Sequence, residues 1–152
     1  MKKNILILFF ILFIGCGYKP IYSTSNTNFT INEIEYDRNK LNKIIDNNLS
    51  SYQNKQDKKI IYNIKINSNE KKIITQKNSK GNPFNFRMSI FVNIEVYENQ
   101  KLKMKKSYEE AFDYENKSKK FELGQYEDQI KIQILKKISN KIIADLYSIK
   151  WF

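Results

Sequence analysis

The most regular pattern of the chain lies between residues 84 and 96, where seven consecutive even-numbered positions are apolar. These positions are Phe84, Phe86, Met88, Ile90, Val92, Ile94 and Val96. Mostly polar residues, such as Asn85, Ser89 and Asn93, alternate with them. Because successive side chains of a strand point to opposite faces, the alternation predicts a long strand with one core face and one wet or partner-facing side.

Weaker patterns predict strands before this one. Residues 29–36 alternate with a shift after Ile31, and residues 60–67 alternate cleanly, with apolar side chains at the even positions. Residues 73–75 would extend the second of these strands past a polar interruption. The long strand carries Phe91 and Tyr97 on its polar side, which marks where that side would meet something apolar.

A fourth strand is expected after a hairpin turn at 98–101, with the sequence ENQK. Apolar residues continue from Leu102 to Tyr114, and their changing phase predicts a bulge near Lys106 or Glu110.

Two segments have the three- and four-residue spacing of amphipathic helices. The first, capped by Asp37 or Asn39, is expected to make about four turns through Tyr52, and the second runs from about Gln125 to Ile149. A coiled coil is a weaker interpretation of the second, because the strands also need a cover. We therefore expect an α+β fold in the order β-α-β-β-β-α, with one four-stranded, mostly antiparallel sheet and both helices packed on one face.

The amino-terminal run of ten apolar residues, 5–14, follows Lys2 and Lys3. A membrane-spanning helix needs roughly twenty apolar residues, whereas this length fits the core of a secretory signal peptide. Export is therefore predicted, and with it an oxidising compartment in which cysteines are normally paired.

Cys16 is the only cysteine of the chain. Its position after Phe13, Ile14 and Gly15 resembles the bacterial lipobox, in which a signal peptidase cuts before a lipid-bearing cysteine. The lipobox favours Leu three residues before the cysteine, where this chain has Phe13. The resemblance predicts lipid attachment at Cys16, and Gly17 resembles a signal for the outer membrane. The alternative is a core cysteine that ends an uncleaved helix.

These features divide the chain into three parts. Residues 1–15 are expected to be the lipoprotein signal peptide, 16–28 the lipidated amino terminus and tether, and 29–152 a single domain. No cofactor other than the covalent lipid is expected.

The chain is strongly basic, with a formal charge of +11. Loss of Lys2 and Lys3 with the signal peptide would leave 11 − 2 = +9. Such a surface attracts acidic lipid head groups or phosphorylated saccharide, and export argues against nucleic acid. The 25 Lys, 24 Ile and 19 Asn against two Arg also fit an AT-biased genome, in which the lysines are merely solvated surface.

An enzyme is not expected. The chain has no histidine, which is the usual general base near neutral pH and the commonest metal ligand. The neighbouring carboxylates Glu109 with Glu110 and Glu127 with Asp128 diverge on either a strand or a helix, so neither pair needs to be a catalytic dyad. No metal site is predicted.

The segment CGYKPIY, residues 16–22, together with this order of elements, resembles the LPS-assembly lipoprotein family, LptE. The resemblance implies a lipoprotein on the periplasmic side of the outer membrane that plugs and helps assemble a large β-barrel, the LptD translocon. There it would help lipopolysaccharide reach the cell surface. The alternative is a periplasm-facing lipoprotein that binds an anionic lipid or glycan without a barrel partner.

Four basic residues near the polar faces of the long hairpin are candidates for contact with the barrel or with lipopolysaccharide. They are Arg87, Lys103, Lys105 and Lys106. Their alternative role is solvated surface.

Overall fold

The computed structural model describes residues 27–149. The predicted signal peptide, Cys16 and residues 17–26 of the predicted tether lie outside the described residues. The described elements are β1 (Phe29–Tyr36), α2 (Lys40–Leu49), the short 3₁₀ helix η2 (Ser50–Tyr52), β2 (Ile60–Lys77), β3 (Pro83–Glu98), β4 (Lys101–Glu115) and α3 (Lys120–Ser148). Their order is the one that the sequence predicts.

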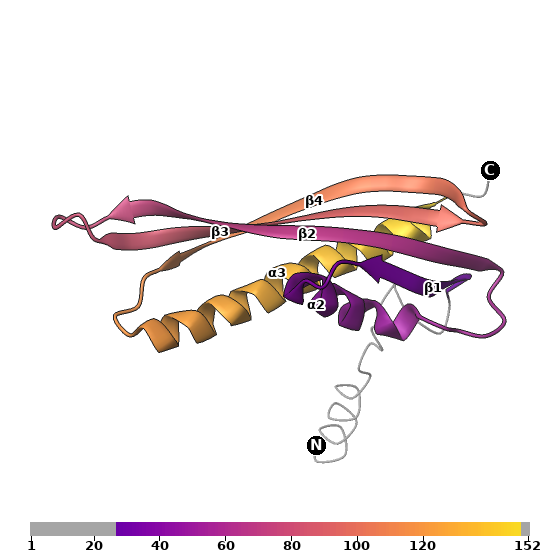
Figure 1. Ribbon diagram of the computed structural model, residues 1–152, viewed down its shortest axis with the longest axis horizontal. Coiled ribbons are helices and arrows are strands. Elements are labelled where there is room, and N and C mark those ends of the chain that lie inside the picture. The colour runs from indigo at the N-terminus through magenta and orange to yellow at the C-terminus, as the bar shows by residue number, and fades with distance from the viewer. Residues whose placement is uncertain (1–26, 150–152) are drawn as a thin grey trace, which may run out of the picture.

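The fold has two layers (Figure 1). The strands form one sheet in the order β1-β2-β3-β4, in which β1 is parallel to β2 and the other two pairs are antiparallel. Both helices lie on the same side of the sheet, and no described element covers the other side (Figure 1). The expected α+β class and the placement of both helices on one face are confirmed.

The core lies between the sheet and the helices. The even positions of β3 from Phe86 to Val96 are at most 8% exposed, as the alternation predicts. From α3, the residues Ile130, Ile134, Leu135, Ile138, Ile142, Ile143 and Leu146 are buried against them. The strands supply most of the buried side chains of this core. Every second residue of a long strand is buried, whereas each turn of an amphipathic helix buries only a few side chains.

We call the contact between the sheet and the helices the seam, and the polar groups inside it have hydrogen-bond partners. Asn39 is the N-cap of α2: its Oδ1 accepts from the Leu41 amide at 3.0 Å, and its Nδ2 donates to the Ser68 carbonyl at 2.8 Å. Buried Ser68 donates in turn to Oδ1 of buried Asn42 at 2.6 Å. These bonds fix the start of α2 against β2, because an unpaired polar group would be costly there.

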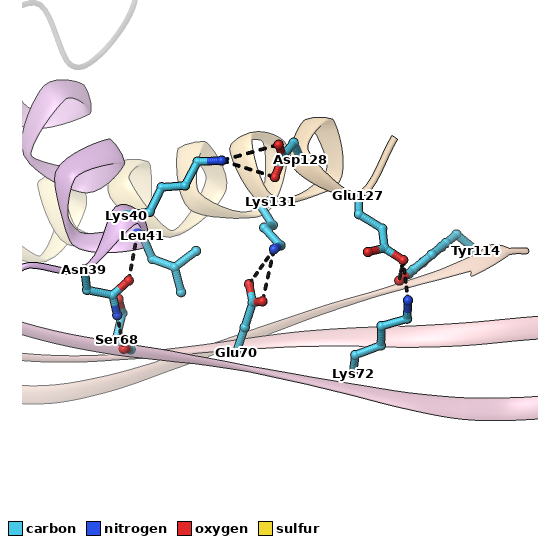
Figure 2. Close-up of polar contacts among 10 residues, drawn as sticks. All are labelled: Asn39, Lys40, Leu41, Ser68, Glu70, Lys72, Tyr114, Glu127, Asp128 and Lys131. Carbon is cyan, nitrogen blue, oxygen red and sulfur yellow. Dashed lines mark hydrogen bonds and ion pairs between the residues drawn. The ribbon is translucent and has the colours of Figure 1, made fainter. Parts of the chain in front are cut away.

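Ion pairs join the helix layer to the sheet where β2 extends past β1. The pairing of β1 with β2 ends at Ile66. Figure 2 shows Lys131 of α3 on Glu70 of β2, and Glu127 of α3 bound by both Lys72 and the Tyr114 hydroxyl. The amino-terminal half of α3 is thus tied to the part of the sheet that α2 does not reach.

Three details of the sequence prediction are wrong. The helix α2 ends at Leu49, because Ser50–Tyr52 tighten into a 3₁₀ turn, so it is shorter than four turns. The helix α3 begins at Lys120 rather than near Gln125. The bulge of β4 is at Lys103, where the register against β3 shifts, rather than near Lys106 or Glu110.

Other details are confirmed. The register of β1 shifts after Ile31, and β2 continues through residues 73–75 to Lys77. At the β3–β4 turn, Asn99 and Gln100 have positive φ angles of 49° and 63°, as two-residue hairpin turns of type I′ require.

We expect truncation of Ile138, which is 0% exposed, to test this core. Ile138→Ala should lower the free energy of unfolding by about 2–5 kcal/mol, because it removes buried methyl groups and leaves a cavity. Urea denaturation measures the change. The matched control is Ile132→Ala on the same helix, where the side chain is 52% exposed and the expected change is within about 0.5 kcal/mol. Equal losses in the two variants would contradict the assigned helix face.

Candidate functional site

The candidate functional site is the uncovered face of the sheet, formed by the odd-numbered residues of β3 and their neighbours. We call it the open face. Its central members on β3 are Arg87, Ser89, Phe91, Asn93 and Glu95, which alternate with the buried even positions. The register brings residues of β2 and β4 beside each of them. The sequence pattern that builds the core therefore also sets this face.

A row of alternating charge crosses the open face. The strand register places Glu35 beside Lys65, Lys65 beside Glu95, and Glu95 beside Lys105. Lys65 Nζ lies 3.0 Å from a Glu35 oxygen, and Lys105 Nζ lies 2.7 Å from a Glu95 oxygen. The Tyr97 hydroxyl also donates to Glu95 at 2.6 Å. All four strands thus contribute to one row of charges that neutralise each other.

These contacts shift the pKa values of Glu95, Lys65 and Lys105 so that the charged form of each is favoured. The hydrogen bond from Lys105, with a second from Tyr97, lowers the pKa of the Glu95 carboxyl below its ordinary value. The bond to Glu35 raises the pKa of Lys65, and the bond to Glu95 raises that of Lys105. Glu95, Lys65 and Lys105 are therefore charged at neutral pH.

The next row is uncharged. Asn67, Asn93 and Ser107 lie side by side across β2, β3 and β4, and the Ser107 hydroxyl donates to Asn93 Oδ1 at 2.6 Å. A hollow of about 490 Å³ borders both rows. It is open, and charged and polar side chains such as Lys65, Glu95 and Ser107 line it, which suits contact with a hydrated surface better than capture of an apolar ligand.

The four basic residues singled out in the sequence do not form one cluster. Arg87 and Lys105 share the open face, but the register places Ser89, Phe91 and Asn93 between the Arg87 row and the Glu95–Lys105 row. Lys103 sits in the β4 bulge, with its Nζ 3.1 Å from Glu98. Lys106 faces the helix layer and binds Asp145 of α3 at 2.7 Å. Their role in binding stays a prediction.

Each of these four cations has a carboxylate partner. For Arg87 the partner is Asp113, held through two hydrogen bonds of 2.7 Å, and this contact lowers the pKa of the Asp113 carboxyl. The sequence reasoning missed this pairing, because it depends on a strand register that a single sequence does not fix. The signal in the sequence was that the two neighbouring predicted strands carry side chains of opposite charge, such as Arg87 and Asp113.

Unpaired lysines lie towards the two ends of the sheet. Among the described residues, no ion pair involves Lys71, Lys77 or Lys80 at the β2–β3 end. The same end projects beyond α3 (Figure 1). It also exposes 43–47% of Ile73, Ile74 and Phe84. We call residues 73–84, which follow the Lys72–Glu127 ion pair with α3, the hairpin tip. Its mixture of cations and exposed apolar side chains is typical of a surface that a partner covers.

The described residues show no arrangement of catalytic acids. Glu109 lies on the open face, whereas Glu110 lies on the helix side and is bound by Lys137 and Lys141. These two hydrogen bonds lower the pKa of the Glu110 carboxyl, which is typical of a structural ion pair. Within residues 27–149 no group of three metal-binding side chains was found, and no helix is long and apolar enough to cross a membrane.

Comparison with known proteins shows the fold. No protein-family model and no curated protein matches the chain. Among solved structures, rare lipoprotein B from Shewanella oneidensis is 12% identical with a TM-score of 0.58, over 77% of this chain and 95% of that one. Lipoprotein B from Nitrosomonas europaea, described as uncharacterized, is 13% identical with a TM-score of 0.60, over 87% and 91%. A putative lipoprotein from Caulobacter crescentus is 13% identical with a TM-score of 0.57, over 80% and 88%.

The charge row makes a testable prediction about Glu95. Its carboxyl should titrate below the ordinary glutamate value of about 4.3, and Lys105→Gln should move the pKa upward, because the largest stabilising hydrogen bond is lost. NMR titration of the side-chain carboxyl measures both. The stability that this carboxylate contributes is present above the unfolded-state pKa and is lost as the pH falls through the folded-state pKa.

Lys101→Gln is the control for this titration, because Lys101 lies on the same strand and takes part in no ion pair among the described residues. A Glu95 pKa that responds equally to both substitutions would show that the row acts only through the general field of the protein.

Proposed function

We propose that the protein is an outer-membrane lipoprotein, anchored through Cys16 on the periplasmic side, that plugs and helps assemble an LptD-like β-barrel for lipopolysaccharide transport. The observation that carries the proposal is the open face, an uncovered side of a long sheet whose central charges, in the row from Glu35 to Lys105 and in the Arg87–Asp113 pair, are already paired within the chain. The interior of a large β-barrel is polar, so a plug needs polar outer surfaces that stay stable when they leave bulk water.

Three further observations support this role. Solved lipoproteins share the fold over most of their length, which fits lipid attachment at Cys16. The molecule is long and thin, with a hairpin tip that projects beyond the helices (Figure 1). The exposed apolar side chains of that tip gain stability when a partner covers them. We infer that the protein acts by binding rather than by catalysis.

A periplasm-facing lipoprotein that binds an anionic lipid or glycan without a barrel is the second candidate. The observation that favours it is the excess of unpaired lysines near the ends of the sheet, which would attract phosphorylated groups. This candidate leaves the open face permanently in water and the hairpin tip uncovered.

Lipid attachment is tested at the amino terminus. The mature protein purified from membranes should begin at Cys16 and carry the mass of diacylglyceryl and acyl groups. Cys16→Ser should release the protein from its stable membrane attachment, because the acyl chains that hold it there are lost. A purified chain that begins at Met1 with a free thiol would refute the proposed anchor.

Partner binding is tested by purification from detergent-solubilised outer membrane. We expect a β-barrel in stoichiometric amount. Asn67→Glu combined with Asn93→Glu should reduce the co-purified barrel at least fivefold, because it buries uncompensated charge in the contact.

The matched control is Asn47→Glu with Asn140→Glu, which adds the same charge at exposed positions of α2 and α3. Thermal unfolding checks that both variants are folded. A wild-type protein that retains lipid but brings no barrel would favour the second candidate. Equal loss of the barrel in both variants would contradict the role given to the open face.

A further inference from the structure

The end of the molecule opposite the hairpin tip is the one at which the chain enters the fold. The Ile60 amide donates to the Asn28 carbonyl, and Phe29 pairs with Ile60 at the start of β1 and β2. The Phe29 ring also packs edge-on against Tyr147 near the end of α3, with ring centroids 5.2 Å apart. The amino-terminal segment and the last turn of α3 therefore meet at this end, which Figure 1 shows on the right.

Four lysines surround this entry point, and we call them the basal lysines: Lys55, Lys58, Lys59 and Lys101. Lys58 and Lys59 directly precede Ile60, and the Lys55 amide donates to Thr30 Oγ1 at 2.8 Å. Lys101 pairs with Glu98, which in turn pairs with Tyr62 of β2, two residues from Ile60. The register and this hydrogen bond thus bring lysines from two separate loops to one end.

Positive charge at this end is not compensated. No ion pair among the described residues involves a basal lysine. The same segments carry Asp57, and Glu98 is bound by Lys103. Asp57 and Glu33, which borders the same hollow as Gln100 of the β3–β4 turn, offset two of the four basal lysines and leave 4 − 2 = +2 on this end. The positive φ angles of Asn54 and Asp57, 51° and 59°, mark tight turns, so the loop holds its lysines in a defined place.

The distance along the chain decides which end of the sheet meets the bilayer. Ten residues, 17–26, separate Cys16 from Thr27, and a fully extended chain of that length spans at most roughly 35 Å. By contrast, the 18 residues of β2 put the hairpin tip roughly 55 Å further away. A lipid at Cys16 therefore holds this end of the fold within about 35 Å of the anchor, which lets the basal lysines reach the membrane surface.

We infer that the basal lysines form a second, electrostatic membrane contact that binds anionic phospholipid head groups beside the lipid anchor. The inference rests on the proposed attachment of lipid at Cys16. Attraction between lysines and an acidic bilayer falls off within about 8–10 Å in physiological salt, so it acts only when this end touches the surface. The contact fixes the basal end of the sheet at the head groups and leaves the hairpin tip, at the opposite end, free to meet a partner.

Trp151, the only tryptophan of the chain, follows the last described residue, Ile149, by two residues and serves as the fluorescent probe. The experiment uses the lipidated full-length mature protein in vesicles whose acyl chains are brominated, with either phosphatidylcholine alone or a mixture with phosphatidylglycerol. We expect Trp151 fluorescence to be quenched at least twofold more strongly in the phosphatidylglycerol vesicles at low salt. The difference should vanish in 0.5 M NaCl.

Substitution of all four basal lysines by Gln should abolish the same difference. The matched control replaces Lys71, Lys77, Lys80 and Lys120 by Gln, which removes the same charge far from the entry point and should leave the difference intact. Equal quenching in both kinds of vesicle, or equal effects of the two variants, would overturn the inference. A mass spectrum of Cys16 separates the two proposals: lipidated protein without a dependence on anionic lipid refutes this inference alone, whereas an unmodified thiol refutes both.

Discussion

The structure depends on the burial of one side of a long β-sheet while the other side stays exposed. The uninterrupted alternation in β3 imposes this, since every even position from Phe86 to Val96 lies in the core and every odd position lies on the open face. Two helices cover the core side: hydrogen bonds of Asn39 and Asn42 with Ser68 hold α2 there, and ion pairs of Lys131 and Glu127 with β2 hold α3. A second layer on the open face would need apolar residues that this alternation does not supply there.

The distribution of charges also follows from the exposure of one side of the sheet. An exposed sheet face gains from opposite charges on neighbouring strands, and the row from Glu35 to Lys105 uses one residue of each strand for this purpose. Towards the ends of the sheet several lysines have no such partner: Lys77 and Lys80 at the tip, and the basal lysines at the entry point. The molecule thus combines a neutralised middle with two cationic ends, which the net charge alone does not reveal.

Much of the fold was predictable because each element has a simple period. The alternation in β3, the shift after Ile31 and the ENQK turn were all visible in the sequence. Boundaries were harder, since α3 starts at Lys120, before its apolar stripe, and its N-cap Lys119 makes no side-chain capping hydrogen bond that the sequence would reveal. The site was the least predictable part. Arg87 and Lys105 were recognised as cations on the polar side, but their partners Asp113 and Glu95 depend on register.

The proposed plug requires that the open face contacts the wall of a barrel. A photo-crosslinking amino acid at Asn93, in the middle of this face, tests this contact in intact outer membrane. We expect a crosslinked product between this protein and a β-barrel, identified by mass spectrometry. A face that crosslinks to no barrel, although the protein is lipidated and present in the outer membrane, would refute the plug.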